Sequence, residues 1–169
     1  GGSVSERLFA VKNLIQGRPV DPAAIRATVA IVTRNRADLL DRAISSLQGQ
    51  TFEPAEIVVV DNGSTDRTPE VVHAWASRSP KVRYVHEPQP GIPHARNRAL
   101  AESSERSDVV AFLDDDCIAR PHWLEELVLP FRYDPEVVSA GGYVQFDPQD
   151  KTLWGDFYCS RNGASKVLP

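Results

Sequence analysis

The sequence predicts an α/β protein, a three-layer α/β/α domain with a mainly parallel central sheet. Short apolar stretches rich in β-branched residues alternate along the chain with amphipathic stretches of helical period. The apolar stretches are hydrophobic throughout, which is typical of parallel strands covered by helices on both faces. A chain of 169 residues is long enough for one such domain with a substantial core.

Buried strands are predicted where short apolar stretches occur, and the stretch at 56–61 is the clearest of them. The predicted strands span residues 28–33, 56–61, 82–86 and 108–113. A fifth strand is predicted at 137–146, where Gly141 and Gly142 interrupt the pattern.

Helices are predicted between these strands. Apolar residues at 39, 40, 43, 44 and 47 share one face of the first helix. Thr68, Pro69 and Glu70 supply an N-cap, a proline at the first helical position and an acidic first turn for the second helix. Two further helices are predicted at 92–102 and from Pro121 onward.

The pattern divides the chain into three parts. Residues 1–27 are expected to be an N-terminal extension, with a modestly amphipathic helix at 4–16 that Gly17 and Pro19 end. This helix either packs on the domain or lies on a membrane surface. Residues 28–146 are expected to form the core, and residues 147–169 are assigned only as the start of a further region.

Composition excludes several classes of protein. The net charge is −4 and no block of lysine or arginine stands out, so no nucleic-acid partner is expected. Cys117 and Cys159 form no C-x-x-C pair, which argues against a zinc site or a disulfide framework. No apolar run approaches the roughly 20 residues needed to span a bilayer. We expect a cytoplasmic location, with the cytoplasmic face of a membrane as the alternative.

Polar side chains follow three of the predicted strands at the point where each strand ends. Thr33 and Asn35 follow the first strand, Asp61 ends the second, and residues 114–116 are three consecutive aspartates after the fourth. Because ligands of open α/β sheets bind at the carboxyl ends of the strands, we expect these residues to meet at one edge.

The three aspartates predict a metal site. Adjacent carboxylates repel by about 3 kcal/mol per close pair at an effective dielectric near 20. Magnesium or manganese removes that repulsion and commonly bridges carboxylates to substrate phosphates. The alternative is a solvated acidic loop that caps the following helix.

Asp61 and the segment 91–98 each allow two interpretations. The Asp61 carboxylate can accept hydrogen bonds from a base or a ribose, or it can serve only the Asp-Asn-Gly-Ser turn. Arg96 lies in the first turns of a predicted helix, where anions bind well, but it could also simply face solvent.

Four segments together resemble the family 2 glycosyltransferases with the GT-A fold. Residues 29–36, V-A-I-V-T-R-N-R, resemble the opening V-x-I-P-T-Y-N-R, with Val32 and Arg34 in place of the usual proline and tyrosine. Residues 58–68 resemble the second-strand signature, residues 91–100 resemble the G-x-x-x-A-R-N-x-A-[IL] helix, and residues 112–117 resemble the D-x-D segment. The resemblance covers residues 28–129.

The resemblance implies a role for each matching residue. Thr33 and Asp61 would contact the nucleotide base, Arg96 the base or the diphosphate, and Asp115 would lie beside the sugar. Asp116 would bind a divalent ion, Mn²⁺ or Mg²⁺, with Asp114 facing the ribose or the metal's water shell. The candidate substrate-binding residues are Thr33, Asn35, Arg36, Asp61, Arg96, Asp114 and Asp115, and the candidate metal ligands are Asp116 and Asp114.

The activity implied by the resemblance is transfer of a sugar from a nucleoside diphosphate carrier, with inversion. A UDP-sugar is the expected donor, and the acceptor could be a saccharide, a lipid-linked sugar, a protein or a small molecule. The general base is not identifiable, because Asp147, Asp150 and Asp156 lie in no recognisable motif. The chain is also shorter than the family's catalytic domain, which suggests a fragment.

Two alternatives come from other classes. The same half-fold could bind a nucleotide or nucleotide-sugar without transferring anything. A phosphoryl-transfer domain also uses aspartates at strand ends, but it places them after the first strand, where this chain has Thr33. A classical NAD-binding domain is excluded because no G-x-G-x-x-G follows the first strand.

Overall fold

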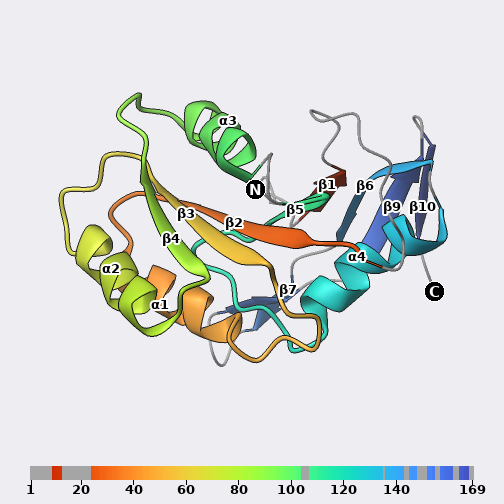
Figure 1. The fold of residues 1–169 in the computed structure, drawn as a ribbon, viewed down its shortest axis with the longest axis horizontal. Coiled ribbons are helices and arrows are strands. Elements are labelled where there is room, and N and C mark those ends of the chain that lie inside the picture. The colour runs from red at the N-terminus through yellow and green to blue at the C-terminus, as the bar shows by residue number, and fades with distance from the viewer. Residues whose placement is uncertain are drawn as a thin grey trace.

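The computed structural model describes residues 9–12, 24–103, 107–134, 136–142, 145–147, 152–154, 157–161 and 164–167. An eight-stranded sheet forms the centre of the molecule, in the order β10-β9-β6-β1-β5-β2-β3-β4 (Figure 1). Four of its strands are parallel to one another: β2 (Ala27–Thr33), β3 (Glu56–Asp61), β4 (Val82–His86) and β5 (Val109–Phe112). These are the four strands predicted between residues 28 and 113.

The sheet continues beyond β5 with antiparallel strands. They are β1 (Phe9–Lys12), β6 (Val137–Gly142), β9 (Phe157–Arg161) and β10 (Ala164–Val167). A separate pair, β7 (Gln145–Asp147) and β8 (Thr152–Trp154), forms a two-stranded sheet. The fifth predicted strand is thus divided into β6 and β7.

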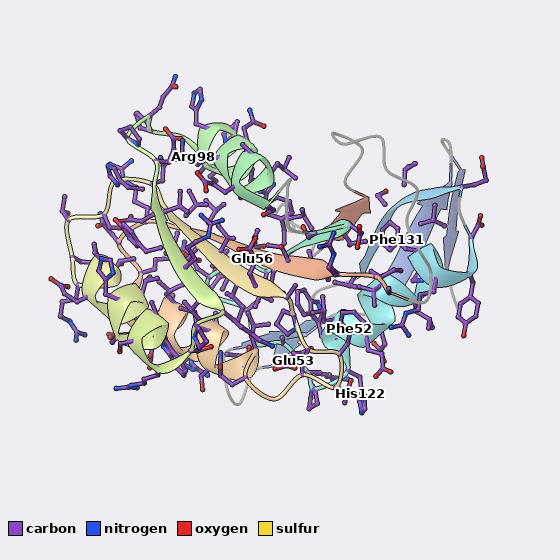
Figure 2. All side chains as sticks on the ribbon, viewed as in Figure 1. Phe52, Glu53, Glu56, Arg98, His122 and Phe131 are labelled. Atoms are coloured by element: carbon purple, nitrogen blue, oxygen red, sulfur yellow. The ribbon has the colours of Figure 1, made fainter. Side chains whose placement is uncertain are left out.

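Helices cover both faces of the sheet. Helices α1 (Ala37–Ser46), α2 (Thr68–Arg78) and α4 (Trp123–Tyr133) lie on one face, and α3 (Ile92–Ser103) lies on the other (Figure 1). Arg98 on α3 and Phe52 beside α4 accordingly lie on opposite sides of the sheet (Figure 2). The three-layer arrangement with a parallel central sheet is confirmed. None of the helices in the described ranges is long and apolar enough to cross a membrane.

The core has two parts because side chains alternate across each strand. Val29 and Ile31 of β2 pack with Leu40 and Leu124 in the part beneath α1, α2 and α4. On the other face, Ala30 of the same strand belongs to a smaller cluster with Ala95 and Ala99 of α3. The hydrogen bond from the Gly91 N–H to Asn62 Oδ1 places the start of α3 beside the end of β3.

The prediction of a helix at 4–16 is wrong for residues 9–12, which form the strand β1. The other residues of that segment lie outside the described residues. β1 lies between β5 and β6 and pairs with both of them. A short apolar run cannot be assigned to helix or strand by periodicity alone. Backbone pairing with β5 and β6, which are far later in the sequence, decides the outcome.

Two helix starts also differ from prediction. Thr68 is the first residue of α2 and not its N-cap, because Asp66 Oδ1 accepts the hydrogen bond of the Thr68 N–H at 2.9 Å. α4 begins at Trp123, two residues after Pro121. The carbonyl oxygen of Pro121 instead accepts a hydrogen bond from the Thr51 N–H at 2.8 Å, which ties this segment to the chain after α1.

Candidate active site

The carboxyl ends of β2 and β3 place two of the predicted site residues side by side. Thr33 and Asp61 are register partners in the parallel pair, and their exposed fractions are only 2% and 1%. The Asn62 N–H donates to the Thr33 carbonyl at 2.9 Å, so the pairing continues one step past the strand end. The prediction that these residues meet at one edge of the sheet is thereby confirmed for this pair.

The loops that follow β2 and β3 are hydrogen-bonded to each other. Asn35 adopts a left-handed backbone conformation, with φ of 55°, which asparagine tolerates better than most residues. Its N–H donates to Ser64 Oγ at 2.9 Å, and its Oδ1 accepts from the Thr65 N–H at 2.7 Å. Asp66 binds the first turns of both helices, since its Oδ2 also accepts from the Ala37 N–H at 3.3 Å. The two loops therefore form one hydrogen-bonded unit.

Asp61 is anchored through both of its carboxylate oxygens. Oδ1 accepts from the Ser64 N–H at 2.9 Å, and Oδ2 accepts from the Tyr84 hydroxyl at 2.8 Å. Burial, together with this bond to Asp61, raises the pKa of Tyr84 to about 12. The turn role that the sequence allowed for Asp61 is thus present, and contact with a nucleoside stays a prediction. The sequence analysis missed Tyr84, which lies in a strand without a motif.

Asn62 is a second residue that the sequence analysis missed. Its side chain is buried, its Nδ2 donates to the carbonyl oxygens of Glu87 and Gln89 at 3.1 and 2.7 Å, and its Oδ1 accepts from the Gly91 N–H at 2.7 Å. Asn62 therefore holds the segment that leads into α3, where Gly91 has a φ of 124°. In the sequence, Asn62 reads only as part of a turn.

The three aspartates are all paired with arginines. Nη1 of Arg36 lies 3.1 Å from Asp115 Oδ1 and 2.9 Å from Asp116 Oδ2. Nη2 of Arg96, from α3, lies 3.6 Å from Asp114 Oδ1. The structure therefore gathers Thr33, Arg36, Arg96 and the aspartates 114–116 at one edge, from three different segments of the chain.

The electrostatics of this cluster are dominated by burial of Asp115. Burial raises the pKa of Asp115, while the nearby Thr33 hydroxyl and Arg36 oppose the rise. Proximity of the Thr33 hydroxyl lowers the pKa of Asp115. The Thr33 Oγ1 atom itself is buried and has no hydrogen-bond partner among the described residues. The charge of Asp115 in turn raises the pKa of Arg36. A cation beside these carboxylates therefore favours their charged forms against the effect of burial.

The chemistry of the cluster fits a divalent ion. Oxygens of Asp115 and Asp116 converge on a single cationic nitrogen, which marks a position where positive charge is held between two carboxylates. Across the ranges that the structure describes, no group of three or more histidine, cysteine or acidic residues is arranged to hold a metal. Mg²⁺ is commonly bound by one or two carboxylates with substrate phosphates and water, so two protein ligands suffice.

Asp114 and Asp116, the predicted metal ligands, differ in their surroundings. Asp116 faces the same nitrogen as Asp115, whereas Asp114 faces Arg96. The assignment of this pair as ligands stays a prediction, and the structure adds Asp115 as a neighbour of the same cation position.

A surface hollow of about 610 Å³ opens beside this cluster, between the starts of α1 and α2. Of the predicted site residues, Asn35 and Arg36 line it. Several of the other lining residues are charged, namely Asp38, Asp66, Arg67 and Glu70. The hollow therefore offers polar surroundings directly next to the Arg36 side chain.

An α/β/α domain with acidic and basic side chains gathered at the carboxyl ends of its parallel strands is typical of nucleotide-binding proteins. The chain belongs to glycosyl transferase family 2, whose family model matches residues 28–165. It is 34% identical over 131 residues to an uncharacterised glycosyltransferase of Nostoc sp., covering 76% of this chain and 40% of that protein. It is also 34% identical over 128 residues to validoxylamine A glucosyltransferase of Streptomyces hygroscopicus, covering 73% and 30%.

Solved structures of glycosyltransferases have the same fold. A mannosyltransferase from Pyrobaculum calidifontis, in complex with GDP-Man and Mn²⁺, matches with a TM-score of 0.58 and 31% identity, covering 69% of this chain and 35% of that one. Glucosyl-3-phosphoglycerate synthase from Mycobacterium tuberculosis, in complex with Mn²⁺ and UDP, matches with a TM-score of 0.57 and 26% identity, covering 68% and 42%. The chain spans 40% of the length of the Nostoc glycosyltransferase and 30% of the length of validoxylamine A glucosyltransferase.

Proposed function

We propose that this chain forms the donor-binding half of a glycosyltransferase, which moves a sugar from a nucleoside diphosphate carrier to an acceptor. One observation carries the proposal: Asp115 and Asp116 hold a single cationic position at the ends of the parallel strands, 3.1 and 2.9 Å from one nitrogen. The structural relatives in complex with Mn²⁺ and a nucleotide or nucleotide-sugar support it.

In this proposal Asp116 binds Mn²⁺ or Mg²⁺, together with Asp114 or Asp115. When bound, the ion supplies Lewis-acid stabilisation of the negative charge that grows on the departing diphosphate. Arg96 lies close enough to Asp114 to add positive charge on the same side of the site. The acidic cluster alone would repel a diphosphate, so cations must balance the charge before the donor can bind.

The nucleoside end of the donor is proposed to lie at the ends of β2 and β3. Thr33, Asn35 and Asp61 supply polar groups there, and the hydrogen bonds between the two loops hold these groups in place. A UDP-sugar is the proposed donor, although one structural relative is in complex with GDP-Man. Inversion and a cytoplasmic location are part of the proposal.

Calorimetric titration with UDP, GDP and ADP tests the proposal, each in Mn²⁺ and in a chelator. We expect one nucleotide to bind in Mn²⁺ and to bind at least about tenfold more weakly in the chelator, a change of about 1.4 kcal/mol. Asp116→Asn should remove the metal-dependent part of the affinity. The matched control is Asp41→Asn, an exposed aspartate of α1 that binds Trp75. Equal UDP affinity of Asp116→Asn and wild type in Mn²⁺ would contradict the metal assignment.

Nucleotide binding without transfer is the second candidate, because the chain covers only part of its relatives. Assaying the chain for donor hydrolysis separates the two. Release of sugar from the nucleotide that binds would favour an active transferase site, whereas binding without turnover would favour a binding half that needs a further segment.

A further inference from the structure

We propose that Arg36 is a built-in counter-ion, which occupies the cation position between Asp115 and Asp116 and must leave before a divalent ion binds there. The inference rests on the proposed metal-dependent function and adds a role for Arg36 that differs from direct substrate contact. The Arg36 counter-ion weakens metal binding in the absence of nucleotide, and metal binding then requires movement of the Arg36 side chain.

The contact geometry shows that one nitrogen serves both carboxylates. Nη1 of Arg36 donates to Asp115 Oδ1 at 3.1 Å and to Asp116 Oδ2 at 2.9 Å. A divalent ion binds carboxylate oxygens at about 2.1 Å for Mg²⁺. An ion held by these same two oxygens would lie in contact with the guanidinium. The two positive charges would repel each other. The two cations therefore exclude each other from this position.

The Arg36 side chain has more room to move than the side chain of Asp115. Its side chain is 48% exposed, whereas that of Asp115 is 9% exposed. The pair with Asp116 is partly exposed on both sides, and an incoming divalent ion replaces the positive charge beside the buried Asp115, so neither carboxylate is left without a cation. The backbone of Arg36 is separately held, since its N–H donates to Thr68 Oγ1 at 3.3 Å. Movement can thus be confined to the side chain.

The neighbouring hollow supplies a place for the released guanidinium. Arg36 already lines this hollow of about 610 Å³, together with the acidic residues Asp38, Asp66 and Glu70 and with Arg67, which is paired with Asp38. Acidic residues outnumber the arginines in this lining, so a displaced Arg36 still has carboxylates as neighbours. Alternatively the guanidinium turns toward a donor phosphate, for which its planar fork is well suited.

Electron paramagnetic resonance of free Mn²⁺ measures the competition directly, without any assay of activity. Arg36→Gln removes the positive charge and keeps a polar side chain, so we expect it to bind Mn²⁺ without nucleotide about 3- to 10-fold more tightly than wild type. Arg36→Lys should lie between the two. The matched control is Arg34→Gln, an exposed arginine two residues away that makes no ion pair with any described residue. It should leave Mn²⁺ affinity near the wild-type value.

Side-chain NMR provides a second measurement. The guanidinium Nε–H signal that is missing in Arg36→Gln identifies Arg36, and addition of Mg²⁺ with the bound nucleotide should shift it. An unshifted signal at saturating Mg²⁺ would show that Arg36 stays in place and would overturn the proposal.

The outcomes separate this inference from the proposed function. If Mn²⁺ binds to wild type with nucleotide and not to Asp116→Asn, while Arg36→Gln binds Mn²⁺ no better than wild type, the metal site stands and the counter-ion role is refuted. An equal increase in Mn²⁺ affinity in Arg34→Gln would also refute the counter-ion role, because the effect would then come from the loss of any nearby positive charge. If neither wild type nor Asp116→Asn binds Mn²⁺ with any nucleotide, both proposals fail.

Discussion

The hydroxyl of Tyr84 donates a hydrogen bond of 2.8 Å to Oδ2 of Asp61, a carboxylate whose exposed fraction is 1%. The two residues lie on the neighbouring strands β4 and β3. His73 of α2 packs against the Tyr84 ring, with the ring centroids 4.8 Å apart. The orientation of the Asp61 carboxylate thus depends on Tyr84, a side chain of the neighbouring strand.

Tyr84→Phe should lower the free energy of unfolding by about 1–3 kcal/mol, because a buried acceptor loses one of its donors. Urea denaturation at neutral pH measures the change. The matched control is Tyr133→Phe, since Tyr133 is 80% exposed and should tolerate loss of its hydroxyl. Similar small effects of the two variants would mean that the bond to Asp61 adds no stability.

Titration of Tyr84 should be visible at alkaline pH. Burial, aided by the bond to Asp61, raises its pKa from 10.0 to about 12. The folded protein therefore holds this proton more tightly than the unfolded chain does, so its stability should fall as the pH rises from about 10 to about 12. Ultraviolet absorbance of phenolate should show one of the four tyrosines ionising late, and Tyr84→Phe should remove that step. A late step that persists in this variant would belong to another tyrosine.

Asn62→Ala should loosen the segment before α3. The substitution removes three hydrogen bonds to residues 87–91 and should cost about 1–3 kcal/mol. Native-state hydrogen exchange should show faster exchange of the Gly91 amide, whose acceptor is lost. Asn97→Ala, at an exposed position of α3, should change stability by less than about 0.5 kcal/mol. Unchanged Gly91 exchange would show that other contacts hold the segment.

Gly63→Ala should destabilise the protein by about 1–2 kcal/mol, because Gly63 has a φ of 72°, where an L side chain is strained. A Cβ at this position meets nothing within 4 Å, so the cost is conformational. Gly49→Ala is the matched control, since a Cβ there also meets nothing and its φ is not in the left-handed range. Thermal denaturation of the two variants should therefore differ, with the Gly49 variant close to wild type.

The parallel strands could be predicted from sequence because their patterns are local. Glu56–Asp61 and Val82–His86 have the predicted boundaries, since β-branched and aromatic residues are frequent in both and polar or turn residues flank them. β1 could not be predicted in the same way. Its four residues form a strand only because β5 and β6 lie on either side of it, and this requires the tertiary fold.

The position of the site was predictable for the same reason, while its internal contacts were not. Strand-end residues of a parallel sheet share an edge whatever their sequence separation, which brings Thr33 near Asp61. The contact of Arg36 with Asp115 and Asp116, about 80 residues later, depends on rotamers and loop conformations that no local pattern encodes. The bond from Tyr84 to Asp61 is of the same kind.

The hydrogen bonds between the loops after β2 and β3 have a consequence for how this domain can be re-engineered. Asn35 exchanges bonds with Ser64 and Thr65, and Asp66 binds the starts of both α1 and α2. A chimera that imports residues 33–37 from a relative would separate these partners. Under the proposed function, donor preference is therefore expected to change only when residues 61–68 are exchanged together with residues 33–37.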